Sequence, residues 1–236
     1  LAGSLTSHVT HTDIWQRIRD NYKLDSSISN RRIDSQFNWY KSHPKYLARV
    51  SKRAERYMFF IMQQIEVRDI PAEIALLPIV ESAFDPFAYS HGRASGVWQF
   101  IPSTGRSYNL QQDWWYDGRR DIRQSTIAAL KFLRGLSREF KGDWMLALAA
   151  YNSGAGTVRK AIRKNKKRGK PLDFWSLSLP KETKAYVPKL LALAKILGDP
   201  EKYGITLSPI PNKPYFAVVE TGSQMDLSQA AQMADI

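Results

Sequence analysis

The spacing of apolar residues restricts the fold most, because it follows the period of an α-helix over much of the chain. Between residues 46 and 65 apolar side chains recur at steps of three and four, which predicts one long amphipathic helix. Similar reasoning predicts helices over 122–140, 144–151 and 181–197, and another that begins near Gly156. Strand patterns are absent before residue 215. The predicted fold class is therefore all-α.

Two segments interrupt this pattern. Pro71 opens a short apolar helix that ends near Val80, and Pro78 within it predicts a kink or a 3₁₀ turn. Residues 84–105 mix Pro, Gly, Ser and aromatic side chains without a period, which predicts an ordered loop system.

Composition divides the chain into three parts. Residues 1–32 are polar apart from a short amphipathic piece around Trp15, and we expect them to form an arm on the core. Residues 33–200 form the main domain. Residues 201–236 begin as a proline-rich linker, followed by a predicted strand over 215–219, Gly222 and a helix over 227–233. This tail resembles the first half of a carbohydrate-binding LysM module, and the simpler alternative is a folded-back tail.

The first four residues are Leu1-Ala2-Gly3-Ser4. Leu-Ala-Gly followed by Cys is the lipid-attachment signature of bacterial lipoproteins, so Ser4 is a candidate replacement for a lipidated Cys. The alternative is that these residues are an expression remnant. No run approaches the roughly 18 apolar residues that a membrane-spanning helix needs.

Charge and cysteine content narrow the chemistry. Lys and Arg outnumber Asp and Glu by 35 to 22, a formal net charge of +13, which favours an anionic partner such as nucleic acid, an acidic membrane surface or an acidic wall polymer. Eight of the basic residues lie in 159–170, either as a solvated face or as a patch for anionic groups. The absence of cysteine excludes disulfides, zinc–thiolate sites and a cysteine nucleophile, and the four histidines lack metal-ligand spacing.

Glu81 is the strongest candidate for catalysis. It ends an apolar helix and is followed by Phe84 and Phe87, so an apolar environment is expected to raise the pKa of its carboxyl group. A general acid that works near neutral pH needs such a pKa. Considered without its neighbours, an exposed helix-end carboxylate would be the commoner interpretation.

Four segments in order resemble the motifs of family 1 lytic transglycosylases, which carry the SLT domain. They are residues 81–86 (ESAFDP), 96–105 (GVWQFIPSTG), 150–154 (AYNSG) and 182–187 (ETKAYV). Flanking segments at 76–80, 89–95 and 114–121 resemble the D subgroup of membrane-bound enzymes in this family. The resemblance covers about residues 35–200, and four motifs in the right order make chance an unsatisfactory explanation.

The resemblance implies a lysozyme-like helical fold of the goose type, and an enzyme that cleaves the β-1,4 bond between N-acetylmuramic acid and N-acetylglucosamine in peptidoglycan without adding water. Glu81 would protonate the leaving oxygen and then accept the proton of the muramyl C6 hydroxyl, which attacks the anomeric carbon to form a 1,6-anhydro end. The resemblance also implies a monomer that needs no metal or cofactor, does not bind nucleic acid, and is located in the periplasm of a Gram-negative bacterium. There it would be associated with the outer membrane, through an N-terminal lipid absent from this chain.

Substrate contacts carry over position by position from the same resemblance. Ser90 matches the serine that binds the N-acetyl group, Gln99 matches a glutamine of the sugar cleft, and Glu182 and Tyr186 would close the cleft opposite Glu81. The other positions expected to contact substrate are Ser82, Trp98, Tyr151 and Asn152. Tyr151 is equally well explained as a packed core aromatic, because the predicted helix before it is apolar all round. Trp98 departs from the more frequent Gly-Leu-Met-Gln form of the second motif, which affects subsite detail rather than chemistry.

Other interpretations remain open at this point. A hydrolytic muramidase needs a second carboxylate, and the nearby candidates are Glu73 and Asp85, of which Asp85 precedes a proline and is better explained as a turn residue. A wall-binding protein without catalytic activity is the other alternative. The aromatic run over 114–116 could stack on sugars or lie in the core.

Overall fold

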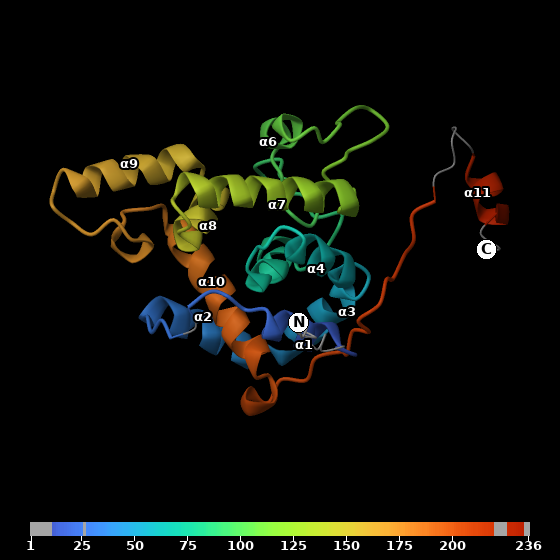
Figure 1. Cartoon of the computed structure of the whole chain (residues 1–236), viewed down its shortest axis with the longest axis horizontal. Helices are drawn as coiled ribbons and strands as arrows, with labels where there is room; N and C mark the ends of the chain where they lie inside the picture. Colours follow the sequence, from blue (N-terminus) through green and yellow to red (C-terminus); the bar gives the residue numbers. More distant parts are fainter. Residues whose placement is uncertain (1–10, 26, 220–225, 234–236) are drawn as a thin grey trace, which may run out of the picture.

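The computed structural model describes residues 11–25, 27–219 and 226–233, and it is helical throughout (Figure 1). Isolated bridges but no paired strands occur among these residues, so the all-α prediction is confirmed for the part of the chain that the structure describes. The α-helices are α1 Ile14–Asp20, α2 Arg31–Ser42, α3 Pro44–Ala54, α4 Met58–Glu66, α5 Leu77–Ser82, α6 Pro102–Ser107, α7 Ile122–Glu139, α8 Trp144–Ser153, α9 Ala155–Lys166, α10 Lys181–Gly198 and α11 Leu227–Met233. Short 3₁₀ helices are η1 Ala72–Leu76, η2 Phe174–Ser176 and η3 Glu201–Tyr203.

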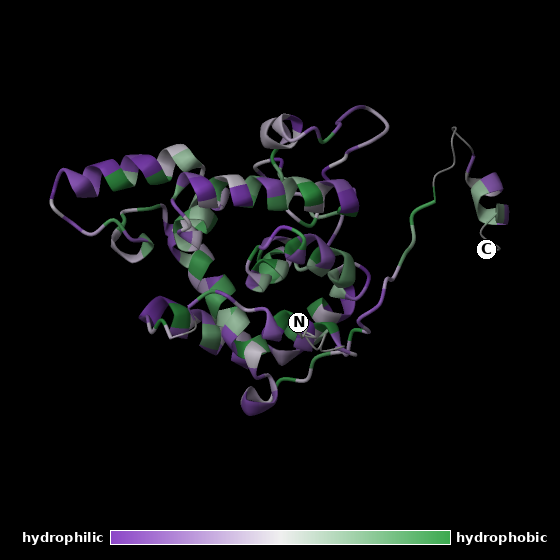
Figure 2. Cartoon of the chain, viewed as in Figure 1, coloured by the Kyte–Doolittle hydropathy of each residue, from purple (hydrophilic) through white to green (hydrophobic). Residues whose placement is uncertain are grey.

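Helix α10 is the central element of the fold. It packs against α2 along one side and against α8, η1 and α5 along others (Figure 1). Its sequence is apolar around most of the circumference from Val187 to Leu197, so it is buried on several sides. Figure 2 shows the same contrast by colour, with hydrophobic residues along α8 and α10 and hydrophilic ones along α9.

Helices α7 and α8 begin where aspartates can cap them. The Asp121 carboxylate accepts the backbone N–H of Gln124, and Asp143 accepts those of Met145 and Leu146, at 2.8 to 3.0 Å. Such caps satisfy N–H groups that have no partner within the helix. Gly154, with a φ of 83°, ends α8 and allows α9 to leave in a new direction.

The helix predicted over residues 46–65 is two helices, and this part of the prediction is wrong. Helix α3 ends at Ala54 and α4 begins at Met58, with a turn between them. The Tyr57 ring stacks on Phe84 with centroids 6.4 Å apart, which holds the turn against the loop that follows α5. Periodicity could not reveal the break, because the apolar spacing continues through it.

The kink predicted at Pro78 is present as a change of helix type, since η1 passes into α5 at Leu77. Helix α1 lies on the core as expected, with Ile14, Trp15 and Ile18 buried. The predicted helix over 227–233 is present as α11, apart from the helical body (Figure 1).

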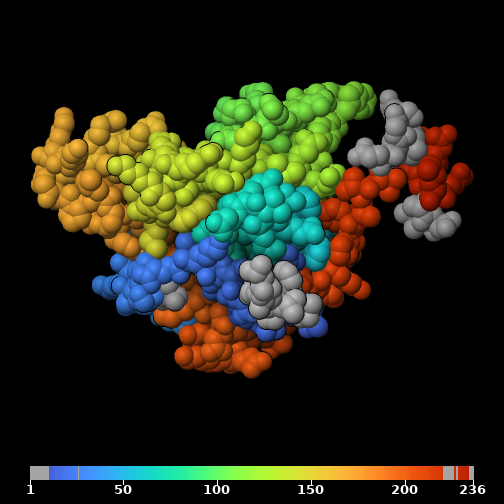
Figure 3. Space-filling view, viewed as in Figure 1, coloured from blue at the N-terminus to red at the C-terminus, as the bar shows by residue number. Residues whose placement is uncertain are grey.

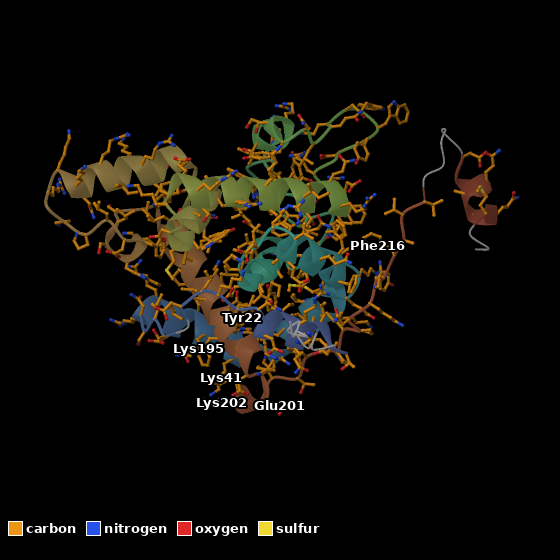
Figure 4. All side chains as sticks on the ribbon, in the orientation of Figure 1. Tyr22, Lys41, Lys195, Glu201, Lys202 and Phe216 are labelled. Atoms are coloured by element: carbon orange, nitrogen blue, oxygen red, sulfur yellow. The ribbon has the colours of Figure 1, made fainter. Side chains whose placement is uncertain are left out.

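The strand expected over residues 215–219 does not form. The segment is irregular and no strand pairs with it among the described residues, and Tyr215, Val218 and Val219 are exposed. The linker before it folds back onto the arm, where the Ile14 N–H donates to the Ile210 carbonyl at 2.9 Å. Phe216 packs on Phe60 with ring centroids 5.9 Å apart (labelled in Figure 4). Ser4 and Gly222 lie outside the described residues.

None of the helices that the structure describes combines the length and the apolar character required to cross a bilayer.

Candidate active site

A cavity of about 760 Å³ brings together most of the residues singled out in the sequence. One side, which we call the helical wall, consists of residues of α5, α7, α8 and α10. The other side, the loop wall, consists of residues 90–101 and the first turn of α6. The helical wall contains Val80, Glu81, Phe132, Ala150, Tyr151, Asn152, Ser153, Gly154, Glu182, Tyr186 and Lys189, and the loop wall contains Ser90, His91, Gly92, Ala94, Gln99, Phe100, Ile101 and Thr104.

Glu81 lies in the last turn of α5 and is partly buried in the helical wall. Burial raises the pKa of its carboxyl group to about 7, and the negative charge of Glu182 adds to this increase. The Tyr186 hydroxyl and the positive charge of Lys189 act in the opposite direction. Both the protonated and the charged form of Glu81 are therefore accessible near neutral pH, as acid–base catalysis requires.

The α10 side chains at positions 182, 186 and 189 line the cavity together because they are four and three residues apart. The Tyr186 hydroxyl donates a hydrogen bond to Oε1 of Glu81. Burial, followed by the charge of Glu81, raises the pKa of Tyr186 well above its usual value, so this hydroxyl keeps its proton. Oε2 of Glu81 has no hydrogen-bond partner in the described part of the chain, and it remains available to a substrate.

Helix α8 contributes Tyr151 and Asn152. The Tyr151 ring packs between Phe132 and Phe100, at centroid distances of 5.3 and 6.4 Å, and its hydroxyl donates to the Trp98 carbonyl at 2.7 Å. Tyr151 thus packs in the core and also lines the cavity. The Asn152 Oδ1 accepts the Thr183 hydroxyl at 2.8 Å, which fixes α8 to α10 at the cavity.

The loop wall depends on polar contacts. The Ser90 hydroxyl accepts the Ala94 N–H at 3.0 Å, and the Gln99 amide donates to the Gly96 carbonyl at 2.8 Å. Gly96 has a φ of 80°, and a Cβ atom there would lie 2.0 Å from the Arg119 carbonyl oxygen. Only glycine fits at this position.

Arg119 holds the loop wall from behind. Its side chain is almost fully buried and forms a two-point ion pair with Asp117 at 2.7 and 2.9 Å. Its remaining nitrogen donates to the carbonyls of Arg93 and Phe100, at 2.7 and 3.2 Å. One buried guanidinium therefore connects both ends of the segment that carries Gln99.

Two predicted contact residues do not line the cavity. Trp98 is fully buried and its indole N–H donates to the Thr126 hydroxyl at 2.9 Å. The Ser82 hydroxyl donates to the carbonyls of Pro78 and Val97, both at 3.1 Å. The prediction that they contact substrate is wrong, since the backbone at 99 has a φ of 50° and turns Gln99 toward the cavity while Trp98 points into the core.

The two carboxylates considered for hydrolysis lie elsewhere. Asp85 accepts the Phe87 N–H at 2.9 Å, as the turn interpretation expects. Glu73 is buried and accepts the N–H groups of Lys23 and Leu24 at 2.9 and 2.8 Å. It lines a separate cavity of about 250 Å³, together with Tyr22 and Lys195, which Figure 4 shows near the far end of α10. Glu182, exposed at the rim, is the second carboxylate of the main cavity.

Sequence reasoning missed four residues of the cavity: His91, Thr104, Phe132 and Lys189. The spacing of three residues from Tyr186 could have identified Lys189. Phe132 gave no such signal, because a cavity-lining aromatic on α7 looks like any core residue in sequence. Within the described residues, no three His, Asp or Glu side chains are grouped as a metal site requires.

Two surface features stand outside the cavity. Trp114 and Trp115 are about nine-tenths exposed, so the core interpretation of this pair is wrong. The basic side chains over 159–170 are exposed along α9 and the turn after it, and Figure 3 shows this segment (gold) protruding from the body.

Comparison with known proteins identifies relatives of the chain. The model of the "Transglycosylase SLT domain" family matches residues 58–174. "Membrane-bound lytic murein transglycosylase D" of Escherichia coli (strain K12) is 48% identical over 98% of this chain and 51% of the relative, so the chain spans about half of that protein's length. A protein of Alteromonas sp. (strain M-1), named "Putative tributyltin chloride resistance protein", is 37% identical over 80% of this chain and 92% of its own length. Among solved structures, the 70 kDa soluble lytic transglycosylase of Escherichia coli superposes with a TM-score of 0.48 at 18% identity, over 75% of this chain and 31% of that one.

Proposed function

Because this chain belongs to the transglycosylase SLT domain family, we propose that it is a lytic transglycosylase that cleaves the bond between N-acetylmuramic acid and N-acetylglucosamine in peptidoglycan. The observation that supports this most is Glu81, a carboxyl group with a pKa of about 7 on the wall of a cavity large enough for sugars. The names of the relatives add support, since two of the matched proteins are named for this activity.

In the proposed mechanism, protonated Glu81 donates its proton to the leaving glycosidic oxygen. The bond to the anomeric carbon breaks and positive charge develops on the muramyl ring. The charged Glu81 then accepts the proton of the muramyl C6 hydroxyl, whose oxygen attacks the anomeric carbon and closes the 1,6-anhydro ring. Glu81 regains its proton, no water is consumed, and one carboxylate suffices for both steps.

Tyr186 has a defined part in this proposal. Its hydroxyl donates to Oε1 of Glu81, so it stabilises the carboxylate formed after the first proton transfer and leaves Oε2 for the substrate. Ser90 and Gln99 on the opposite wall are positioned to bind the sugar's polar groups, and Tyr151 and Asn152 complete the helical wall.

Hydrolysis is the second candidate, and Glu182 is the observation that favours it. A muramidase would use this second carboxylate of the cavity to activate water or to form a covalent intermediate. Purified peptidoglycan digested by Glu81→Gln and Glu182→Gln separates these roles. We expect Glu81→Gln to lose turnover, and Glu182→Gln to retain most of it. Equal loss in both variants would favour hydrolysis, and normal turnover in Glu81→Gln would refute the proposed acid.

The proposal extends to the cellular setting. We propose a monomer that acts on glycan strands in the periplasm and associates with the outer membrane through an N-terminal lipid. The names of the membrane-bound relatives support a membrane association. Extraction of the native protein with and without detergent, followed by mass spectrometry of its N-terminus, tests the lipid.

A further inference from the structure

A second hollow adjoins the active-site cavity and contains a cluster of aromatic side chains. Its volume is about 340 Å³, and it shares Val80 and Lys189 with the main cavity. The rest of its lining comes from α2 and the first turn of α3, which precede the matched family segment of residues 58–174. We call it the aromatic shelf, and its remaining lining residues are Ser35, Gln36, Trp39, Tyr40 and Tyr46.

Trp39 provides the shelf with an exposed and rigid ring. It is 45% exposed although it is a tryptophan on a packed helix. The imidazole of His43 stacks on it with centroids 4.3 Å apart, and the rings of Tyr40 and Tyr46 contact it edge to face at 5.2 and 5.4 Å. These three contacts fix the orientation of the indole, so a ligand would lose little side-chain entropy there.

The shelf is also fixed relative to Glu81. The Tyr46 hydroxyl donates to the Ile79 carbonyl at 3.2 Å, and Ile79 lies two residues before Glu81 in α5. Helix α2 packs along α10, which carries Lys189 and Tyr186 (Figure 1). The shelf and the candidate acid are therefore positioned by the same two helices.

The lining chemistry matches a pyranose ring. Aromatic faces bind the apolar C–H face of a sugar, while the side chains of Ser35, Gln36 and Lys189 can hydrogen-bond to hydroxyl and amide groups at its edge. A stem peptide, which carries carboxylates, would find only one cation in this lining, Lys189. The volume is suited to a single ring rather than to a longer segment.

We propose that the aromatic shelf binds one further sugar residue of the glycan strand, stacked on Trp39, beyond the sugars held in the main cavity. This inference rests on the proposed function, since it takes the strand that occupies the main cavity to be peptidoglycan. A strand long enough to reach the shelf would bind more tightly, so the shelf would set a preference for longer strands.

Kinetics with peptide-free peptidoglycan oligosaccharides test the shelf. The wild-type protein should have a lower KM for an octasaccharide than for a tetrasaccharide, and Trp39→Ala should raise the octasaccharide KM about tenfold with a smaller effect on the tetrasaccharide. Trp39→Phe should keep part of the preference, because it retains an aromatic face. Tyr215→Ala, which removes an exposed aromatic outside both cavities, is the matched control and should change neither KM.

The outcomes separate the shelf from the reaction. A folded Trp39→Ala protein that keeps the full length preference would overturn the shelf while leaving the cleavage intact. If the wild-type protein cleaves neither oligosaccharide, the proposed function fails, and octasaccharide binding to Glu81→Gln with and without Trp39→Ala still tests the shelf. If Trp39→Ala fails to fold, Gln36→Ala and Trp39→Phe replace it, and an unchanged length preference in both contradicts the proposal.

Discussion

The two walls of the active-site cavity are built in different ways. The helical wall consists of side chains on α5, α7, α8 and α10, whose other faces pack in the apolar core. The loop wall has irregular backbone, with positive φ angles at Arg93, Gly96 and Gln99. It is held by polar bonds that converge on Arg119. The acid is therefore carried by the more robust wall, and the substrate contacts opposite depend on a few specific polar interactions.

The largest effect is expected from breaking the polar support of the loop wall. Arg119→Met leaves the Asp117 carboxylate and two backbone carbonyls without their partner, and we expect a loss of about 3 kcal/mol of stability together with most of the activity. Arg120→Met is the matched control, because Arg120 is exposed and makes one hydrogen bond, to Ser95 at 3.1 Å. Urea unfolding of both variants measures the difference, and equal losses would contradict the special role of Arg119.

A smaller but more local effect is expected at Gly96. Gly96→Ala places a methyl group against the Arg119 carbonyl at a φ of 80°, so the loop must shift. Gly142→Ala has a similar φ of 88° with nothing within 4 Å, so it measures the backbone strain alone, about 1 kcal/mol or more. We expect Gly96→Ala to lose much more activity than the control on a peptidoglycan turbidity assay. If the two variants behave alike, the close approach to Arg119 is not important.

These predictions show what the sequence could and could not reveal. The helical wall was largely accessible, because the spacing that made α10 a helix also put Glu182 and Tyr186 on one face. The loop wall was accessible only through resemblance. In an irregular loop the direction of each side chain depends on backbone angles such as the φ of 50° at Gln99, and no periodicity encodes them. Trp98 was misassigned for this reason, and the break between α3 and α4 was missed because it lies within a continuous apolar pattern.

On the helical wall, Tyr186→Phe should change the pH dependence rather than the fold. The Tyr186 hydroxyl stabilises the charged form of Glu81, so its removal raises the pKa of Glu81 further above its present value of about 7. The basic limb of the pH–activity profile should move up by about one unit, with lower maximal activity. Tyr151→Phe is the control, since it loses the bond to the Trp98 carbonyl and should leave this limb in place. A shift in both variants, or in neither, would contradict the assigned contact.

The smallest effect concerns stability. The pKa of Glu81 is raised from 4.5 to about 7 in the folded protein, so the folded state binds more protons than the unfolded state between these values. Stability from this group is therefore present below pH 4.5 and is lost as the pH rises to 7. Glu81→Gln removes the charge, so its melting temperature relative to the wild type should increase from pH 4.5 to pH 8. A constant difference across this range would show that the pKa is not raised.

The central claim is that one carboxyl group, Glu81, cleaves the glycan with the substrate's own C6 hydroxyl as the nucleophile. Mass spectrometry of the products from purified peptidoglycan tests it most directly. The account predicts muropeptides that end in 1,6-anhydromuramic acid, formed by the wild-type protein and absent with Glu81→Gln. Products with reducing ends, one water heavier, would contradict it.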